Sequence, residues 1–148
     1  FIEDKIGRKG VKMVFVKLIE KVEDYKEAIR ISCCILEENG IVGRSYYKAI
    51  LNNIKEYGGY FYLGKGICMP PARAAAGALK AGICGLSLKR PVLFYGKEVW
   101  VFLTLSAGDE EEHLRNLQKI VQICRDDERV KEIKEAKNDE ELSALIGG

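Results

Sequence analysis

The residues best placed for chemistry surround a stiff turn within the stretch GKGICMPPARAAAG, residues 64–77. A strand-like run, 67–69, leads into Pro70 and Pro71, and a helix-prone run of small residues follows. Because each proline lacks an amide donor and fixes φ, the chain must turn there. Such a strand end is where α/β proteins place their functional groups. Cys68 is a nucleophile by residue type, but its position in a strand indicates a place in the core.

The other reactive side chains give no metal-binding pattern. The chain has one histidine, His113, and five cysteines. With no C-x-x-C and no closely spaced Cys/His pair, we expect no metal site and no cofactor. Apolar neighbours predict free, buried thiols, and we expect Cys33, Cys68 and Cys124 to be mostly buried. His113 borders the apolar stripe of a predicted helix, so a partly buried structural histidine is one interpretation.

Size and charge narrow the class of protein. The 148 residues predict one domain over 1–148, long enough to bury a core. The 24 basic and 22 acidic residues are interspersed, which argues against a nucleic-acid partner. The longest apolar run, 99–105, is far shorter than the roughly 18 residues that span a bilayer. With no visible signal peptide, we expect a cytoplasmic protein that is not inserted in a membrane.

The N-terminal half predicts one strand followed by two helices. Val and Ile enrichment in 11–19 indicates a strand. The box Asp24-x-x-Glu27 starts a helix that runs through Leu36 and ends at Asn39-Gly40. A second helix starts at Ser45, runs through Ile54 and ends at Gly58-Gly59.

The rest of the chain predicts strands and then helices. Four segments have strand character: 60–63, 67–69, 82–88 and 98–107. Between the last two, 89–97 is expected to be a turn-bearing connection broken by Pro91 and Gly96. Helices are expected from the box at Asp109 to Cys124, over 127–136, and over 138–145. The fold class is therefore α/β, a mixed central β-sheet flanked by helices.

Several of these segments, in this order, resemble one family. They are DYKEAIR (24–30), NGIVGRSYYKAI (39–50), YLGKGICMP (62–70) and LKRPVLFYGKEVWVFLTLSAGDEEEHL (88–114). Together they resemble the enzyme IIA domain of the bacterial sugar phosphotransferase system, in its fructose/mannitol/ascorbate/nitrogen-regulatory class. The spacing is most similar to ascorbate-type members. The resemblance implies the sandwich fold of the mannitol-type enzyme IIA.

The resemblance also implies a site and partners. In the family, the residue after the proline that matches Pro70 is a histidine. It takes a phosphoryl group from the histidine-phosphocarrier protein and passes it to enzyme IIB. Here that position is Pro71, whose amide nitrogen has no available lone pair. His113 matches a second histidine beside the acceptor, and Lys55 matches an arginine that contacts phosphate.

Arg73 is the remaining candidate for a phosphoryl contact. It lies two residues past Pro71 and could meet a phosphoryl group or an acidic partner. An exposed loop arginine is the alternative interpretation, as a solvated helix-end lysine is for Lys55.

Two functions stay open at this point. The first is a phosphotransferase-system enzyme IIA component, a phosphocarrier by descent whose acceptor is replaced by Pro71. The second is a non-catalytic regulatory or binding module that keeps the docking surface for the phosphocarrier protein or enzyme IIB. With either function, the resemblance implies a protein that acts beside a membrane transporter. An unrelated small α/β domain is a third interpretation. Whether the chain is an enzyme is left open, because the acceptor histidine is absent.

Overall fold

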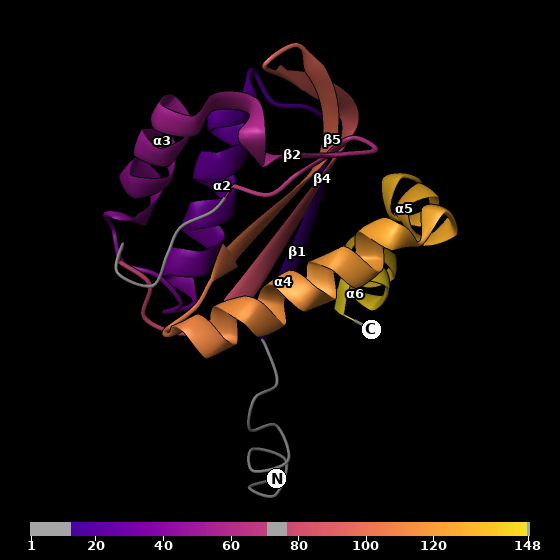
Figure 1. Cartoon of the computed structure of the whole chain (residues 1–148). Coiled ribbons are helices and arrows are strands. Elements are labelled where there is room, and N and C mark those ends of the chain that lie inside the picture. Colours follow the sequence, from indigo (N-terminus) through magenta and orange to yellow (C-terminus); the bar gives the residue numbers. More distant parts are fainter. Residues whose placement is uncertain (1–12, 71–76, 148) are drawn as a thin grey trace, which may run out of the picture.

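A five-stranded mixed sheet forms the centre of the protein (Figure 1). The structure is a computed structural model that describes residues 13–70 and 77–147. The strand order is β1-β4-β5-β3-β2. The strands are β1 (Met13–Ile19), β2 (Tyr62–Gly64), β3 (Ile67–Cys68), β4 (Gly82–Phe94) and β5 (Lys97–Ser106). β1 is parallel to β4 and β3 is parallel to β5, whereas β4–β5 and β2–β3 are antiparallel.

Helices cover both faces of the sheet, as Figure 1 shows. On one face lie α2 (Tyr25–Glu38) and α3 (Tyr46–Tyr57), followed by a short 3₁₀ turn, η1 (Gly58–Phe61). On the other lie α4 (Glu110–Arg125), α5 (Asp127–Lys134) and α6 (Asp139–Gly147). The expected α/β sandwich is therefore confirmed. None of the helices described is long and apolar enough to cross a membrane.

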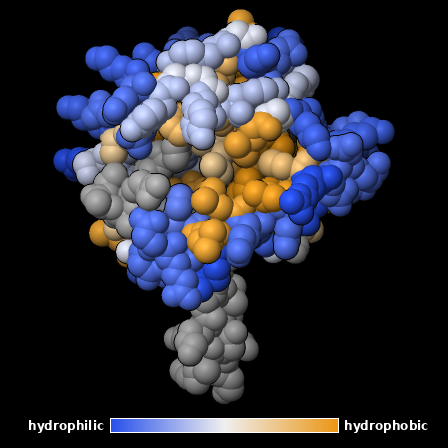
Figure 2. Space-filling view, viewed as in Figure 1, coloured by the Kyte–Doolittle hydropathy of each residue, from blue (hydrophilic) through white to orange (hydrophobic). Residues whose placement is uncertain are grey.

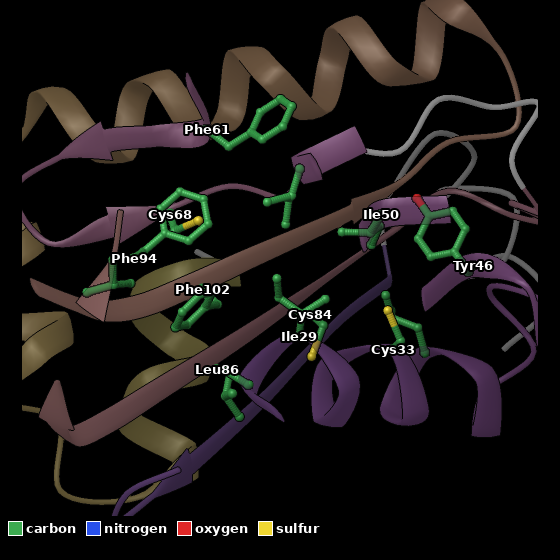
Figure 3. Close-up of a cluster of buried hydrophobic side chains, with 14 of the residues drawn as sticks. Ile29, Cys33, Tyr46, Ile50, Phe61, Cys68, Cys84, Leu86, Phe94 and Phe102 are labelled. Atoms are coloured by element: carbon green, nitrogen blue, oxygen red, sulfur yellow. The ribbon is translucent and has the colours of Figure 1, made fainter. Parts of the chain in front are cut away.

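Each face of the sheet buries its own apolar core. Figure 3 shows the core under α2 and α3, where Ile29 and Ile50 pack toward Cys84, Leu86 and Phe102. The opposite core packs α4, α5 and α6 onto the alternate residues of β5, Val101, Leu103 and Leu105. This strict alternation along a strand is what a sheet covered on both sides requires.

Two acidic caps start helices as the sequence predicts. Asp24 accepts a hydrogen bond from the Glu27 amide (2.9 Å), and Asp109 accepts one from the Glu112 amide (2.8 Å). Each glutamate also reaches back, and the Glu112 carboxylate accepts from the Gly108 amide at 2.7 Å. These bonds satisfy amides that a helix start leaves without partners.

Two secondary-structure predictions are wrong. Residues 60–63 are not one strand, because the 3₁₀ turn extends through Phe61, whose ring packs into the core, and β2 begins at Tyr62. Residues 89–97 are not a long connection either. β4 continues to Phe94 past Pro91, which a bulge between Ser87 and Val92 accommodates because no ladder donor is needed there. The actual turn is two residues, Tyr95-Gly96, both with positive φ.

The cysteines are more varied than their apolar neighbours predict. All five are free; Cys33, Cys68 and Cys84 are buried, as expected for the first two. Cys124 is only partly buried and Cys34 is exposed. Cys34 follows Cys33 on α2, and a step of one residue turns the side chain by about 100°. The prediction that every thiol is buried is therefore wrong for Cys34.

Thiol labelling should follow this burial. In the folded protein at neutral pH, a maleimide should modify Cys34 first and Cys124 more slowly. Burial raises the pKa of Cys33 and Cys84 to about 12, so the reactive thiolate is scarce at those sites. Peptide mass spectrometry would measure the order, with the guanidinium-unfolded protein as the control in which all sites react. Equal, rapid labelling of every thiol in the native protein would contradict the fold.

Candidate functional site

The candidate site begins where two parallel strands point the same way. Ile67 and Cys68 of β3 pair with Val101 and Phe102 of β5. The chain then continues through Met69 to the buried Pro70, while β5 runs on to Ser106. The carboxyl end of β3, an inner strand, therefore lies beside Phe102, four residues before the end of β5. Pro71 and Arg73 lie outside the described residues, and their assigned roles stay predictions.

The chain re-enters the described structure beside the start of α3. The Gly43 amide donates to the Gly77 carbonyl at 2.8 Å. Gly77 has φ +98°, and a Cβ on it would lie 2.9 Å from the Ser45 hydroxyl oxygen and 3.6 Å from the Tyr46 amide nitrogen. A side chain is therefore excluded there both by conformation and by space. Residue 77 lies directly against the first turn of α3.

Tyr46 ties that first turn to the sheet. Its side chain is fully buried, and its hydroxyl donates to the Leu105 carbonyl near the end of β5. Burial raises the pKa of this phenol, so it stays a neutral donor. The N-terminus of α3 is thus fixed near the carboxyl end of β5.

The first turn of α4 places His113 at the same end of the sheet, just after the carboxyl end of β5. α4 starts four residues after Ser106, and the Asp109 cap fixes its first turn. The His113 amide donates to the Asp109 carbonyl at 3.1 Å. The imidazole is partly buried, and its Nδ1 is buried with no hydrogen-bond partner in the described structure.

Asn116 is a buried polar residue that the sequence analysis does not single out. It is fully buried on α4, and its side-chain amide donates to the Ser106 carbonyl at 2.9 Å. This bond joins the second turn of α4 to the last residue of β5. The available signal was a polar residue three positions after His113, among the apolar positions of the helix.

Lys55 is placed away from this edge. It is exposed in the last turn of α3, next to Ile54, whose carbonyl accepts from the Tyr95 hydroxyl at 3.4 Å. Tyr95 belongs to the turn that precedes β5, whereas His113 follows its other end. A ten-residue strand spans roughly 30 Å. The structure therefore does not bring Lys55 and His113 together, and phosphate contact by Lys55 stays a prediction.

Two helix N-termini place partial positive charge near the carboxyl end of β5. The N-termini of α3 and α4 carry partial positive charge and amides without helical partners. Arg44 precedes α3 directly and is exposed, and Ser45 makes no side-chain capping bond. Three glutamates in the first turn of α4 oppose this charge on that helix. An anion is therefore favoured at the α3 side of the edge.

Two other candidate chemistries find no support in the described residues. Cys68 is completely buried, and burial raises the pKa of its thiol, which suits a core residue. Within the described ranges, no three His, Cys, Asp or Glu side chains lie close enough to hold a metal ion.

An apolar groove opens between the β2–β3 hairpin and α4, with a volume of about 470 Å³. Figure 2 shows apolar side chains gathered in the middle of this face, with hydrophilic ones around them. Lys65 and Arg125 lie at its rim. The apolar lining residues are Leu63, Met69, Leu117, Ile120, Val121 and Cys124. Because Met69 precedes Pro70 and Leu117 lies one helical turn after His113, the groove adjoins the candidate site.

The family follows from comparison with known proteins. Residues 11–147 match the sequence model of the family described as phosphoenolpyruvate-dependent sugar phosphotransferase system, EIIA 2. The chain belongs to this family. The resemblance seen in the sequence is thereby confirmed.

Individual relatives agree with this assignment. The ascorbate-specific EIIA component of Escherichia coli K12 is 28% identical over 135 residues, which are 88% of each chain. The solution structure of the mannitol-specific cryptic enzyme IIA CmtB from Escherichia coli has a TM-score of 0.79 at 26% identity, over 94% of this chain and 93% of that one. A complex of enzyme IIA-Mtl with phosphorylated enzyme IIB-Mtl, also from Escherichia coli, gives 0.75 at 23% identity over 90% and 99%. This last likeness shows the fold alone.

The buried hydrogen bond of Tyr46 predicts that loss of its hydroxyl lowers the free energy of unfolding. Tyr46→Phe removes the donor to the buried Leu105 carbonyl, and an unsatisfied buried acceptor costs about 1–3 kcal/mol. Urea unfolding should show a loss of that size in the free energy of unfolding. Tyr47→Phe is the matched control, because its exposed hydroxyl bond to the Lys26 carbonyl is 3.3 Å long. Equal losses in the two variants would contradict the anchoring role of Tyr46.

Proposed function

We propose that this enzyme IIA domain, over 1–148, docks the proteins of a phosphoryl relay at the carboxyl ends of β3 and β5. With Pro71 at the acceptor position, this chain binds those partners without carrying the phosphoryl group itself. The supporting observation is that β3 leads to Pro70 in the direction in which β5 runs, and that the α3 N-terminus and the first turn of α4 both lie at the carboxyl end of β5. We place this activity in the cytoplasm.

The chemistry of residue 71 decides between carrying and docking. A neutral imidazole is a nucleophile at cytoplasmic pH and forms a reactive N–P bond. The ring nitrogen of Pro71 is an amide whose lone pair is delocalised, so it cannot attack phosphorus. Phosphoryl transfer otherwise needs positioning and donors for the equatorial oxygens. Backbone amides and helix N-termini can supply both, and they do not depend on the side chain at 71.

The partners proposed are the histidine-phosphocarrier protein and enzyme IIB. The Escherichia coli complex described above pairs an enzyme IIA of the same fold with a phosphorylated enzyme IIB. In this chain, the apolar groove beside Pro70 offers a surface for such a partner. Val121 is 46% exposed and Leu114 is 55% exposed, so apolar area is available next to the proposed transfer point.

Restoring the acceptor should restore transfer. Pro71→His should take label from phosphoenolpyruvate through the relay kinase and the histidine-phosphocarrier protein, whereas the unchanged chain should take none. In that background, His113→Ala should slow transfer roughly ten- to a hundredfold, because one charge-assisted contact is worth about 1.5–3 kcal/mol. Quenched-flow labelling would measure both rates.

The outcomes of this experiment separate the two functions. A folded Pro71→His protein that takes no label would show that more than the acceptor is missing. Docking would then be the one remaining function of the two. Label on the unchanged chain would refute the proposal that this chain docks its partners without carrying the phosphoryl group. Circular dichroism of each variant would check that the fold is kept.

The groove should be needed for docking. Val121→Glu places a charge in the apolar groove, and leaving a charge without a partner against an apolar surface should weaken binding at least roughly tenfold. Titration calorimetry against enzyme IIB proteins of ascorbate- and mannitol-type systems would measure the affinity. Gln122→Glu is the matched control, because Gln122 is exposed on the same helix and does not line the groove. Equal affinity of both variants would exclude the groove from the docking surface.

A further inference from the structure

Two buried polar atoms without partners lie on the same face of α4. One is Nδ1 of His113 and the other is Oδ1 of Asn116, and the described structure gives neither a hydrogen bond. A buried polar atom without a partner costs free energy, so an arrangement that satisfies both is favoured. Nothing in the family assignment explains Asn116.

The helix places these two side chains next to each other. Residues three apart on a helix are neighbours, about 5–6 Å between Cβ atoms. Helical side chains also point back toward the N-terminus, which directs Asn116 toward the turn that carries His113. The amide nitrogen of Asn116 is already used by the Ser106 carbonyl at 2.9 Å. The atom left facing its surroundings is therefore Oδ1, which can only accept a hydrogen bond.

Donor and acceptor chemistry permits one direct pairing. Nδ1 of a neutral imidazole is either a donor or an acceptor, depending on the tautomer. Only the tautomer with its proton on Nδ1 can pair with the Asn116 oxygen. The structure does not contain this bond, because neither atom has a partner in it, so the pairing requires a rotation of one of the two side chains. We propose that Asn116 is a positioning residue that holds neutral His113 as the Nδ1–H tautomer, with the proton donated to Asn116 Oδ1.

This tautomer decides which nitrogen faces an incoming group. With Nδ1 committed to Asn116, Nε2 is left unprotonated and free. It can then take a proton and donate it to a phosphoryl oxygen, a use that rests on the proposed function. The tautomer itself does not rest on that function, since it is a property of the isolated chain.

The test uses the fact that His113 is the only histidine. In the ¹⁵N-labelled unchanged chain, long-range ¹H–¹⁵N correlation at a pH where the ring is neutral gives one set of imidazole signals. We expect a protonated Nδ1 and an unprotonated Nε2, which is the minor tautomer of a neutral histidine side chain in water. A predominantly Nε2–H ring, as a water donating to both buried atoms would produce, overturns the proposal.

Variants identify Asn116 as the cause. Asn116→Leu removes the acceptor and should move the ring toward the Nε2–H tautomer. Asn116→Asp keeps an acceptor but loses the donor to Ser106, and it should keep Nδ1 protonated. Gln118→Leu also replaces a side-chain amide by leucine, but at an exposed position of α4, and it should leave the spectrum unchanged. An Nδ1–H tautomer that persists in Asn116→Leu overturns the proposal.

The readout stays informative in two difficult cases. If Asn116→Leu does not fold, the tautomer of the unchanged chain and of Asn116→Asp still decides the question. Because no partner protein is present in the spectroscopic measurement, a failure of the unchanged chain to bind enzyme IIB in the calorimetric titration would refute the proposed function without changing this result.

Discussion

The candidate site depends on the pairing of β3 with β5, although β3 is only two residues long. The Gly66 carbonyl accepts from the Trp100 amide at 2.8 Å and from the Val101 amide at 3.2 Å. The Met69 amide donates to the Phe61 carbonyl at 3.0 Å, which holds the other side of the strand. Without this pairing, nothing would direct Pro70 toward the end of β5.

A side-chain contact supports this short strand from outside the sheet. Lys65, in the turn between β2 and β3, donates to the Cys124 carbonyl at 2.7 Å and pairs with Asp127. A cation at a helix C-terminus is favoured by the helix dipole. Lys65 therefore joins the hairpin that leads to Pro70 to the far end of α4, the helix that carries His113 at its start. Both parts of the candidate site are positioned by the same two elements, β5 and α4.

The sequence predicts the parts of the fold that local chemistry decides. The boxes at Asp24 and Asp109 cap helices as expected, because capping involves residues three apart in the chain. The prediction at 89–97 is wrong because Pro91 usually breaks a strand, and only long-range pairing of β4 with β5 and a bulge make it tolerable there. The apolar neighbours of Cys34 predict a buried thiol, but the helical period turns this side chain outward.

The candidate site is predictable in the same uneven way. The resemblance picks out His113, and the structure places it just after β5, one helical turn before Leu117, which shares a groove with Met69. The resemblance could not place Lys55, because it matches positions along the sequence. It does not say whether the last turn of α3 lies near the start or the end of β5. Asn116 was missed because one polar residue on an apolar helix face has no meaning until its partner, the Ser106 carbonyl, is known.

The proposed function gives separate roles to the elements around the candidate site and to the side chain of residue 71. The hydrogen bonds that hold β3 to β5, α3 to Leu105 and α4 to Ser106 are made by residues other than 71. Positioning and anion binding rest on these elements, whereas the covalent step needs one imidazole at one position. Replacing that imidazole by proline removes a nucleophile without removing any of these contacts. In the proposed function, docking and the covalent chemistry are therefore independent properties, and a change at residue 71 alone can separate them.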